Sequence, residues 1–259
     1  MVSPGSTHAA TTADKPFAFR VAFVDQRQGQ ALARFAFHGL DARRAAVLYD
    51  VTGSHHSGVA EVFQRVFDDL GGRVVASEGY TAGDRDFSRQ LGRIAAGDPQ
   101  VLLLPNFDVD VQAQARQARD LGIEATFLGT DGWSLPRLQQ SPELDGAFAS
   151  QHWHPDLTTT NSRARKLAAA SQRIRGELPD AIMALTYDAV GLVLEAADGL
   201  PSAEPRLLRK ALAELEEYPG AAGTITYRGT GGDPLKTVWI THLTGGGNQI
   251  HPWSEPMGD

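Results

Sequence analysis

The sequence contains no cysteine among its 259 residues, so disulfides, thiolate metal sites and thiol catalysis are excluded. It also lacks any run of about 18 apolar residues, the length that would span a bilayer as a helix. Residues 1–14 are polar and carry neither the basic start nor the apolar stretch of a secretory signal. As written, the chain is therefore not expected to be exported.

Clustered positive charge is also scarce. The formal net charge is −7, from 24 Lys and Arg against 31 Asp and Glu, and the basic residues are scattered in short groups such as Arg43-Arg44. Because phosphate binding depends on clustered Lys and Arg, we expect no nucleic-acid partner. A hydrophobic content of 42% with 21% charged residues is typical of a globular protein that buries a core.

Common catalytic and cofactor motifs are missing too. There is no Gly-x-Gly-x-x-Gly segment that enters a helix, no Gly-x-Ser-x-Gly elbow and no His-x-x-x-His pair. The glycines of residues 229–232 lie between two predicted strands and indicate a hairpin turn. Histidines cluster at residues 55–56 and 152–154, but neither cluster has carboxylates at a useful spacing, so we expect no metal. No catalytic residue and no cofactor is predicted.

What the sequence does contain is a regular alternation of strands and helices. Short apolar runs at 45–49, 73–77, 101–104 and 126–128 predict strands. Apolar residues at helical spacing predict helices over 59–70, 87–96 and 109–121, each followed by glycine. Strands that alternate with helices of this length favour an α/β fold with a doubly wound parallel sheet covered on both faces.

The pattern changes after about residue 155. Helices are predicted over 161–175, 180–197 and 205–217, followed by strands at 223–227 and 237–243. The helix over 180–197 is apolar on most sides. Three helices and two strands do not make a self-sufficient α/β core. The pattern therefore predicts that part of the sheet on which these helices would pack is missing from this chain. We expect the isolated chain to be poorly stable or to self-associate through the incomplete part.

Polar and aromatic residues follow the predicted strands. Ligands of open α/β sheets bind at the carboxyl ends of the strands. The candidates there are Asp25, Thr52, Ser54, His55, Asn106, Phe107, Thr130, Asp131 and Trp133. This set offers carboxylates, hydroxyls and aromatic rings without a basic residue, which suits an amino-bearing ligand. Two alternatives stay open: Asp25 and Asp131 as helix N-caps, and Phe107 as ordinary core.

The order of several short motifs resembles the Leu/Ile/Val-binding protein family, which belongs to the type I periplasmic binding proteins. The resemblance covers nearly the whole chain. It rests on residues 2–7, Phe19-Arg20-Val21, Asp25, Gln28-Gly29, Val47-Leu48-Tyr49-Asp50, Tyr80, Gly83-Asp84, Asp86-Phe87, Arg116-Gln117-Ala118-Arg119 with Leu121-Gly122, Phe127-Leu128-Gly129, Asp131-Gly132, Tyr187-Asp188-Ala189, Gly223 and Gly232-Asp233.

The resemblance implies a two-lobed type I periplasmic-binding fold with doubly wound parallel sheets. Lobe 1 would comprise residues 1–23 and 156–234, and lobe 2 would comprise residues 24–155 with a tail over 235–259. The first strands of lobe 1 would lie upstream of Met1, which would leave that lobe incomplete.

The implied function is that of an extracytoplasmic solute-binding protein. Such a protein would capture a small amino acid or amide by closing its two lobes around it, without making or breaking a covalent bond. It would deliver the ligand to the membrane permease of an ABC transporter. A ligand-sensing regulator or receptor domain of the same fold is the alternative, and an α/β enzyme is a further one.

The resemblance also implies ligand contacts. Gly5 and Thr7 match a loop that holds the carboxylate and amino groups of the ligand. Asp25 matches a cleft carboxylate at the hinge, and Asp131 matches the acidic residue that pairs with the ligand ammonium. The remaining implied contacts are aromatic positions: His55, at or next to a position where many members carry Tyr; Phe107, at a second such position; and Trp133, which would cap the side-chain pocket.

Overall fold

The computed structural model describes residues 1–245 and 247–255, and it divides into two compact units. Unit 1 contains residues 1–24, 152–239 and 255, and unit 2 contains residues 25–151 and 240–254. The lobe boundaries expected at residues 23, 155 and 234 stay a prediction.

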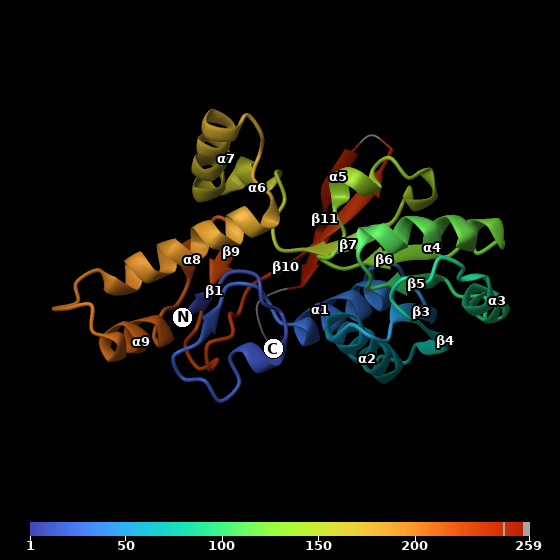
Figure 1. Ribbon diagram of the computed structural model, residues 1–259, viewed down its shortest axis with the longest axis horizontal. Coiled ribbons are helices and arrows are strands. Elements are labelled where there is room, and N and C mark those ends of the chain that lie inside the picture. The colour runs from blue at the N-terminus through green and yellow to red at the C-terminus, as the bar shows by residue number, and fades with distance from the viewer. Residues whose placement is uncertain (246, 256–259) are drawn as a thin grey trace. The chain divides into compact units, whose positions relative to one another are not determined.

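Unit 2 is built on a sheet of seven strands in the order β11-β10-β7-β6-β5-β3-β4 (Figure 1). The strands are β3 (Arg44–Asp50), β4 (Arg73–Tyr80), β5 (Val101–Leu104), β6 (Thr126–Gly129), β7 (Phe148–Gln151), β10 (Val238–Thr244) and β11 (Gly247–Glu255). All neighbouring pairs from β4 to β7 are parallel. The strand order reverses direction between β3 and β5, so the predicted doubly wound sheet is confirmed. Such a reversal leaves a crevice at the carboxyl ends of the two strands.

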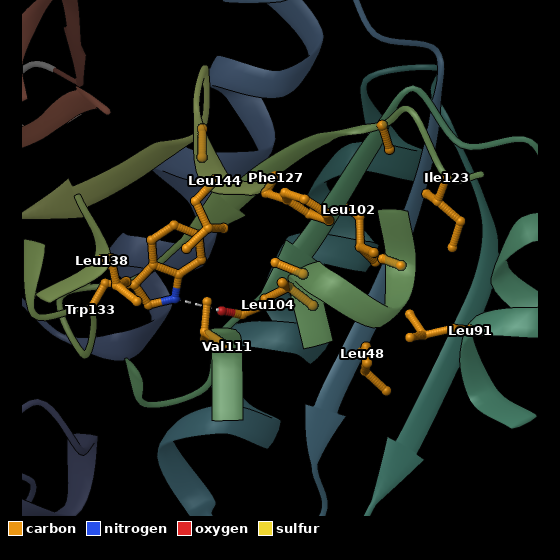
Figure 2. Close-up of a cluster of buried hydrophobic side chains, with 14 of the residues drawn as sticks. Leu48, Leu91, Leu102, Leu104, Val111, Ile123, Phe127, Trp133, Leu138 and Leu144 are labelled. Atoms are coloured by element: carbon orange, nitrogen blue, oxygen red, sulfur yellow. Dashed lines mark hydrogen bonds between the residues drawn. The ribbon is translucent and has the colours of Figure 1, made fainter. Parts of the chain in front are cut away.

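Helices cover both faces of this sheet. They are α1 (Asp25–Arg34), the π-helical turn η2 (Phe35–Gly39), α2 (Ser54–Asp69), α3 (Ser88–Ala96), α4 (Asp108–Asp120), α5 (Leu135–Leu138) and the short 3-10 helix η3 (Pro142–Leu144). Leu102 and Leu104 of β5 join the core under α3 and α4, which Figure 2 shows. Val101 and Leu103 join the opposite core under α1 and α2. Side chains that alternate between two buried faces explain why this strand is apolar throughout.

Helix α1 was not predicted from the sequence, because its apolar positions are few and glycine lies in its middle. That glycine permits close packing against α2. A Cβ atom added to Gly29 would lie 2.9 Å from the carbonyl oxygen of Val59 and 3.0 Å from the Cβ of Val62. The close approach brings the first residue of α1 beside the first turn of α2, and the candidate site lies there.

Unit 1 is rich in helices and poor in strands. Its elements are β1 (Val2–Ser3), η1 (Ala9–Thr11), β2 (Phe19–Arg20), α6 (Leu157–Thr160), α7 (Ser162–Arg175), α8 (Ala181–Ala197), α9 (Pro205–Ala213), β8 (Tyr218–Gly220) and β9 (Gly223–Ile225). Within the described residues, β1 pairs only with β2, and β8 pairs only with β9. The predicted helix over 205–217 ends four residues earlier, at Ala213. The predicted strand over 237–243 corresponds to β10, which joins the sheet of unit 2.

Helix α8 leaves much of its apolar surface uncovered in unit 1. Its inner face buries Ala184, Leu185 and Leu192. Ile182, Val190 and Leu194 lie on the other side and are 56–66% exposed, next to a groove of about 1130 Å³. A contiguous apolar surface of this kind favours association, because burying it removes apolar area from water.

We therefore expect the 259-residue chain, expressed alone, to self-associate through this face of α8. Replacing Ile182, Val190 and Leu194 together with glutamine should shift the weight-average mass measured by sedimentation or light scattering toward that of the monomer. The matched control replaces Val109 and Leu121, which are exposed apolar residues of unit 2. Equal masses for both variants at every concentration would contradict the expectation.

Candidate functional site

Three predicted site residues of unit 2 meet at the carboxyl ends of its strands. Asp25 begins α1, His55 lies in the first turn of α2, and Asp131 follows β6. The imidazole Nδ1 of His55 lies 2.7 Å from Oδ1 of Asp25, and its Nε2 lies 3.8 Å from Oδ1 of Asp131. The Asp25 side chain is 3% exposed, His55 20% and Asp131 17%, so the group is largely withdrawn from water.

Gln28 and Phe107 complete this cluster. Nε2 of Gln28 donates to Oδ1 of Asp131 over 2.7 Å, while its Oε1 is buried without a hydrogen-bond partner among the described residues. The ring of Phe107 is stacked on His55, with 6.5 Å between ring centroids and 14° between planes. An acceptor without a donor next to a carboxylate favours a ligand that brings N–H groups.

The expectation that the histidines lack carboxylate partners is wrong. His55 contacts Asp25 and Asp131, which lie 30 residues before it and 76 residues after it in the chain. Nδ1 of His56 lies 3.6 Å from Oδ2 of Asp50. These partners come from other elements, so spacing along the sequence could not reveal them. No group of three metal-ligating residues is found in residues 1–245 and 247–255.

Two neighbouring histidines have opposite electrostatic environments. Burial lowers the pKa of His55, but the hydrogen bond with Asp25 and the charges of Asp131 and Asp25 outweigh it, and the net pKa is raised. The pKa of His56 is lowered, chiefly by burial and by the charge of His55. Of the two rings, His55 is therefore the one whose protonated form its surroundings favour.

For Asp131 and Phe107, the structure decides between the alternatives left open by the sequence. Asp131 does not cap α5, because the N-cap of that helix is Ser134. Asp25 is the first residue of α1, and its carboxylate accepts from His55. Phe107 is 54% exposed at the start of α4, so it is not part of the core.

Several other predicted polar residues hold the loops of this edge in place. The buried amide of Asn106 donates from Nδ2 to the carbonyl of Leu48 over 2.9 Å and accepts the backbone N–H of Asp50 over 3.1 Å. The hydroxyl of Thr52 donates to Asp50 over 2.7 Å. Ser54 is the first residue of α2, and Thr130 is fully buried after β6. The bonds of Asn106 fix the ends of β3 and β5 relative to one another.

Trp133 lies elsewhere than the sequence suggested. Its side chain is 2% exposed and belongs to the core under α4. The indole N–H donates to the carbonyl of Leu104 over 3.1 Å, as Figure 2 shows. A Cβ on Gly129 would lie 2.1 Å from the indole, so this glycine makes room for the ring. We therefore leave Trp133 out of the proposed ligand contacts.

Gly5 and Thr7, the other two predicted ligand contacts, lie together in a loop of unit 1. Gly5 is exposed and Thr7 is half-buried. The fully buried guanidinium of Arg20 supports this loop: Nη1 donates to the carbonyls of Ser6 and His8, at 3.2 and 2.8 Å.

The same guanidinium anchors the end of the loop. Nη2 of Arg20 donates to the carbonyl of Ala9 over 3.1 Å and to the hydroxyl of Thr12 over 2.6 Å. Its Nε lies 2.7 Å from Oδ1 of Asp233. These roles of Arg20 and Gln28 were not predicted, and the available signal is the unusual placement of polar residues among buried apolar ones.

The amino-acid sequence matches a family model described as periplasmic binding protein over residues 1–248. The chain belongs to the periplasmic binding protein family. A leucine-binding protein, LivK, from Thermotoga maritima has the same fold, with a TM-score of 0.89 and 29% identity over 99% of this chain and 73% of that one. LivJ from Streptococcus pneumoniae, solved in complex with isoleucine, also shares the fold, with a TM-score of 0.81 and 23% identity over 98% of this chain and 71% of that one.

Curated relatives of this periplasmic binding protein are similar at the level of sequence. The Leu/Ile/Val-binding protein homolog 1 of Brucella abortus is 25% identical over 93% of the chain and 64% of its own length. BraC3 of Rhizobium johnstonii, a Leu/Ile/Val-binding protein, is 27% identical over 80% of the chain and 56% of its own length. The chain thus spans less than two thirds of the length of these relatives. Among the described residues, none of the helices combines the length and the apolar character that a bilayer-spanning segment needs.

Proposed function

We propose that this protein captures a small amino acid or amide outside the cytoplasm and delivers it to the membrane permease of an ABC transporter. It binds and releases its ligand without making or breaking a covalent bond. Family membership supports the class of function, and the names of relatives that bind leucine, isoleucine or valine support the class of ligand.

The main structural support for an amino-bearing ligand is the pairing of Asp131 with Gln28 in unit 2. Asp131 offers a carboxylate that is 17% exposed, and Gln28 offers a buried Oε1 that has no donor among the described residues. An ammonium group has three N–H donors and a positive charge, so its chemistry matches a carboxylate that lies beside a further acceptor. Phe107, which is 54% exposed beside them, supplies an apolar surface for the rest of the ligand. Ligand contacts of Gly5 and Thr7 in unit 1 stay a prediction from the resemblance.

Thermal unfolding of the full-length natural protein tests the proposal. Leucine, isoleucine, valine and small amides should raise the melting temperature, because a ligand that binds only the folded state stabilises it by mass action. Sugar phosphates and dicarboxylates serve as the comparison set, since the cluster presents carboxylates to the ligand. Stabilisation by the comparison set alone would overturn the proposal.

A further inference from the structure

His55 places a titratable cation where a ligand ammonium would bind. Its Nδ1–H is held by Asp25 at 2.7 Å, so the ring is oriented with Nε2 toward Asp131, at 3.8 Å from Oδ1. The oxygen that Nε2 faces is also the one that accepts from Gln28. When it is protonated, the imidazolium neutralises part of the charge that would otherwise attract a cationic group.

The other titratable groups around His55 and its neighbour His56 come from four elements and one loop. Asp25 lies on α1, His56 on α2 with 5.5 Å between the two ring centroids, and Asp131 in the loop after β6. Asp50 of β3 and Asp110 of α4 act on His56. The two carboxylates that face His55 directly favour its charged form, which agrees with the raised pKa of this ring.

We propose that His55 competes with the ligand ammonium for Asp131, so that ligand binding expels the proton of His55. This inference rests on the proposed function, because it requires a ligand with an ammonium group. An ammonium on Asp131 would lie close to Nε2 of His55, and two like charges in a partly buried site repel each other. The neutral ring relieves this repulsion and keeps its Nδ1–H bond with Asp25.

The direction of the pH dependence follows from linkage. In the free protein the pKa of His55 is raised by its carboxylate neighbours. In the ligand-bound protein the pKa of His55 is lower, because the ligand ammonium repels the imidazolium. Below the bound pKa both states are protonated and the affinity is low and constant. Between the two pKa values the affinity rises with pH, approaching about tenfold per pH unit for one released proton, and above the free pKa it levels off.

Calorimetry of the full-length natural protein with leucine, at several values between about pH 5.5 and 8.5, tests the coupling around the histidine range. Two buffers of different ionisation enthalpy report the number of protons exchanged. We expect proton release, and an affinity that rises with pH as derived. His55→Gln should remove both effects, because glutamine keeps an N–H donor for Asp25 and does not titrate. His38→Gln, at an exposed position of unit 2, is the matched control and should keep both.

The outcomes separate this inference from the proposed function. Leucine binding with proton uptake, or an affinity that changes by less than about twofold over the range, would overturn the coupling and leave the function standing. Absence of binding by leucine, isoleucine, valine and amides at every pH would overturn both. Nuclear magnetic resonance adds an independent readout, since the titration midpoint of the His55 ring must fall when leucine saturates the protein.

Discussion

Asp131→Asn should weaken amino-acid binding by about 2–5 kcal/mol, the range found when one partner of a buried charge pair is removed. Such a loss raises the dissociation constant by at least about 30-fold. The substitution keeps the size of the side chain and a carbonyl acceptor for Gln28, so the loop after β6 is not expected to move. The ligand ammonium, however, loses the carboxylate that compensates its desolvation.

Calorimetry with leucine on the full-length protein measures this effect, and Asp120→Asn is the matched control. Asp120 is an exposed aspartate at the carboxyl end of α4, the end opposite the cluster. The control removes the same charge from the same unit and should change the affinity by less than about 0.5 kcal/mol. If the two variants bind alike, Asp131 does not hold the ammonium.

Arg20→Met should destabilise unit 1 by about 3–5 kcal/mol, because breaking a buried charge pair leaves the other polar groups without compensation. Methionine retains an unbranched apolar chain but none of the donors. The carbonyls of Ser6, His8 and Ala9 then lose their partner, and Asp233 keeps a carboxylate that is only 37% exposed. The loop that carries Gly5 and Thr7 should lose its fixed conformation.

Hydrogen exchange measures this local effect separately from unit 2. The backbone N–H groups of Val21 and Ala22, which donate to Ser3 and Pro4, should exchange faster in the variant. Amides of β5 in the core of unit 2 should keep their protection. The control is Arg43→Met, which removes a half-exposed guanidinium paired with Asp41 and should cost no more than about 1 kcal/mol. Unchanged protection at Val21 and Ala22 would contradict the role given to Arg20.

Several features of the candidate site could be predicted from local sequence. The strand that ends at Leu104 is a continuous apolar run, and the strand that ends at Gly129 contains Phe127 and Leu128. Phe107 and Asp131 follow the ends of these strands, and His55 follows the end of β3. In a parallel sheet those ends share one edge, so strand assignment alone brings these residues together. The predicted helices over 109–121 and 161–175 agree with α4 and α7 within one residue, because both have regular apolar spacing and clear ends.

Other features escaped prediction because their signals are not local. Helix α1 has few apolar residues, and it forms because Gly29 lets it pack closely on α2. Trp133 was assigned to the ligand pocket because it adjoins Asp131. Its burial depends on the space that Gly129 leaves for the ring and on the carbonyl of Leu104, which lies on the neighbouring strand β5, 29 residues earlier in the chain.

Three features could be read from the amino-acid sequence alone: the alternating fold of unit 2, the strand-poor character of unit 1 and the sheet edge at which polar and aromatic side chains gather. These follow from periodicity and from turn residues, which act over a few positions. The position of His55 between Asp25 and Asp131, with Gln28 beside them, became evident from the folded chain. The charge of that group depends on distances between α1, α2 and the loop after β6, and those distances are set by how the helices pack on the sheet rather than by any spacing along the chain.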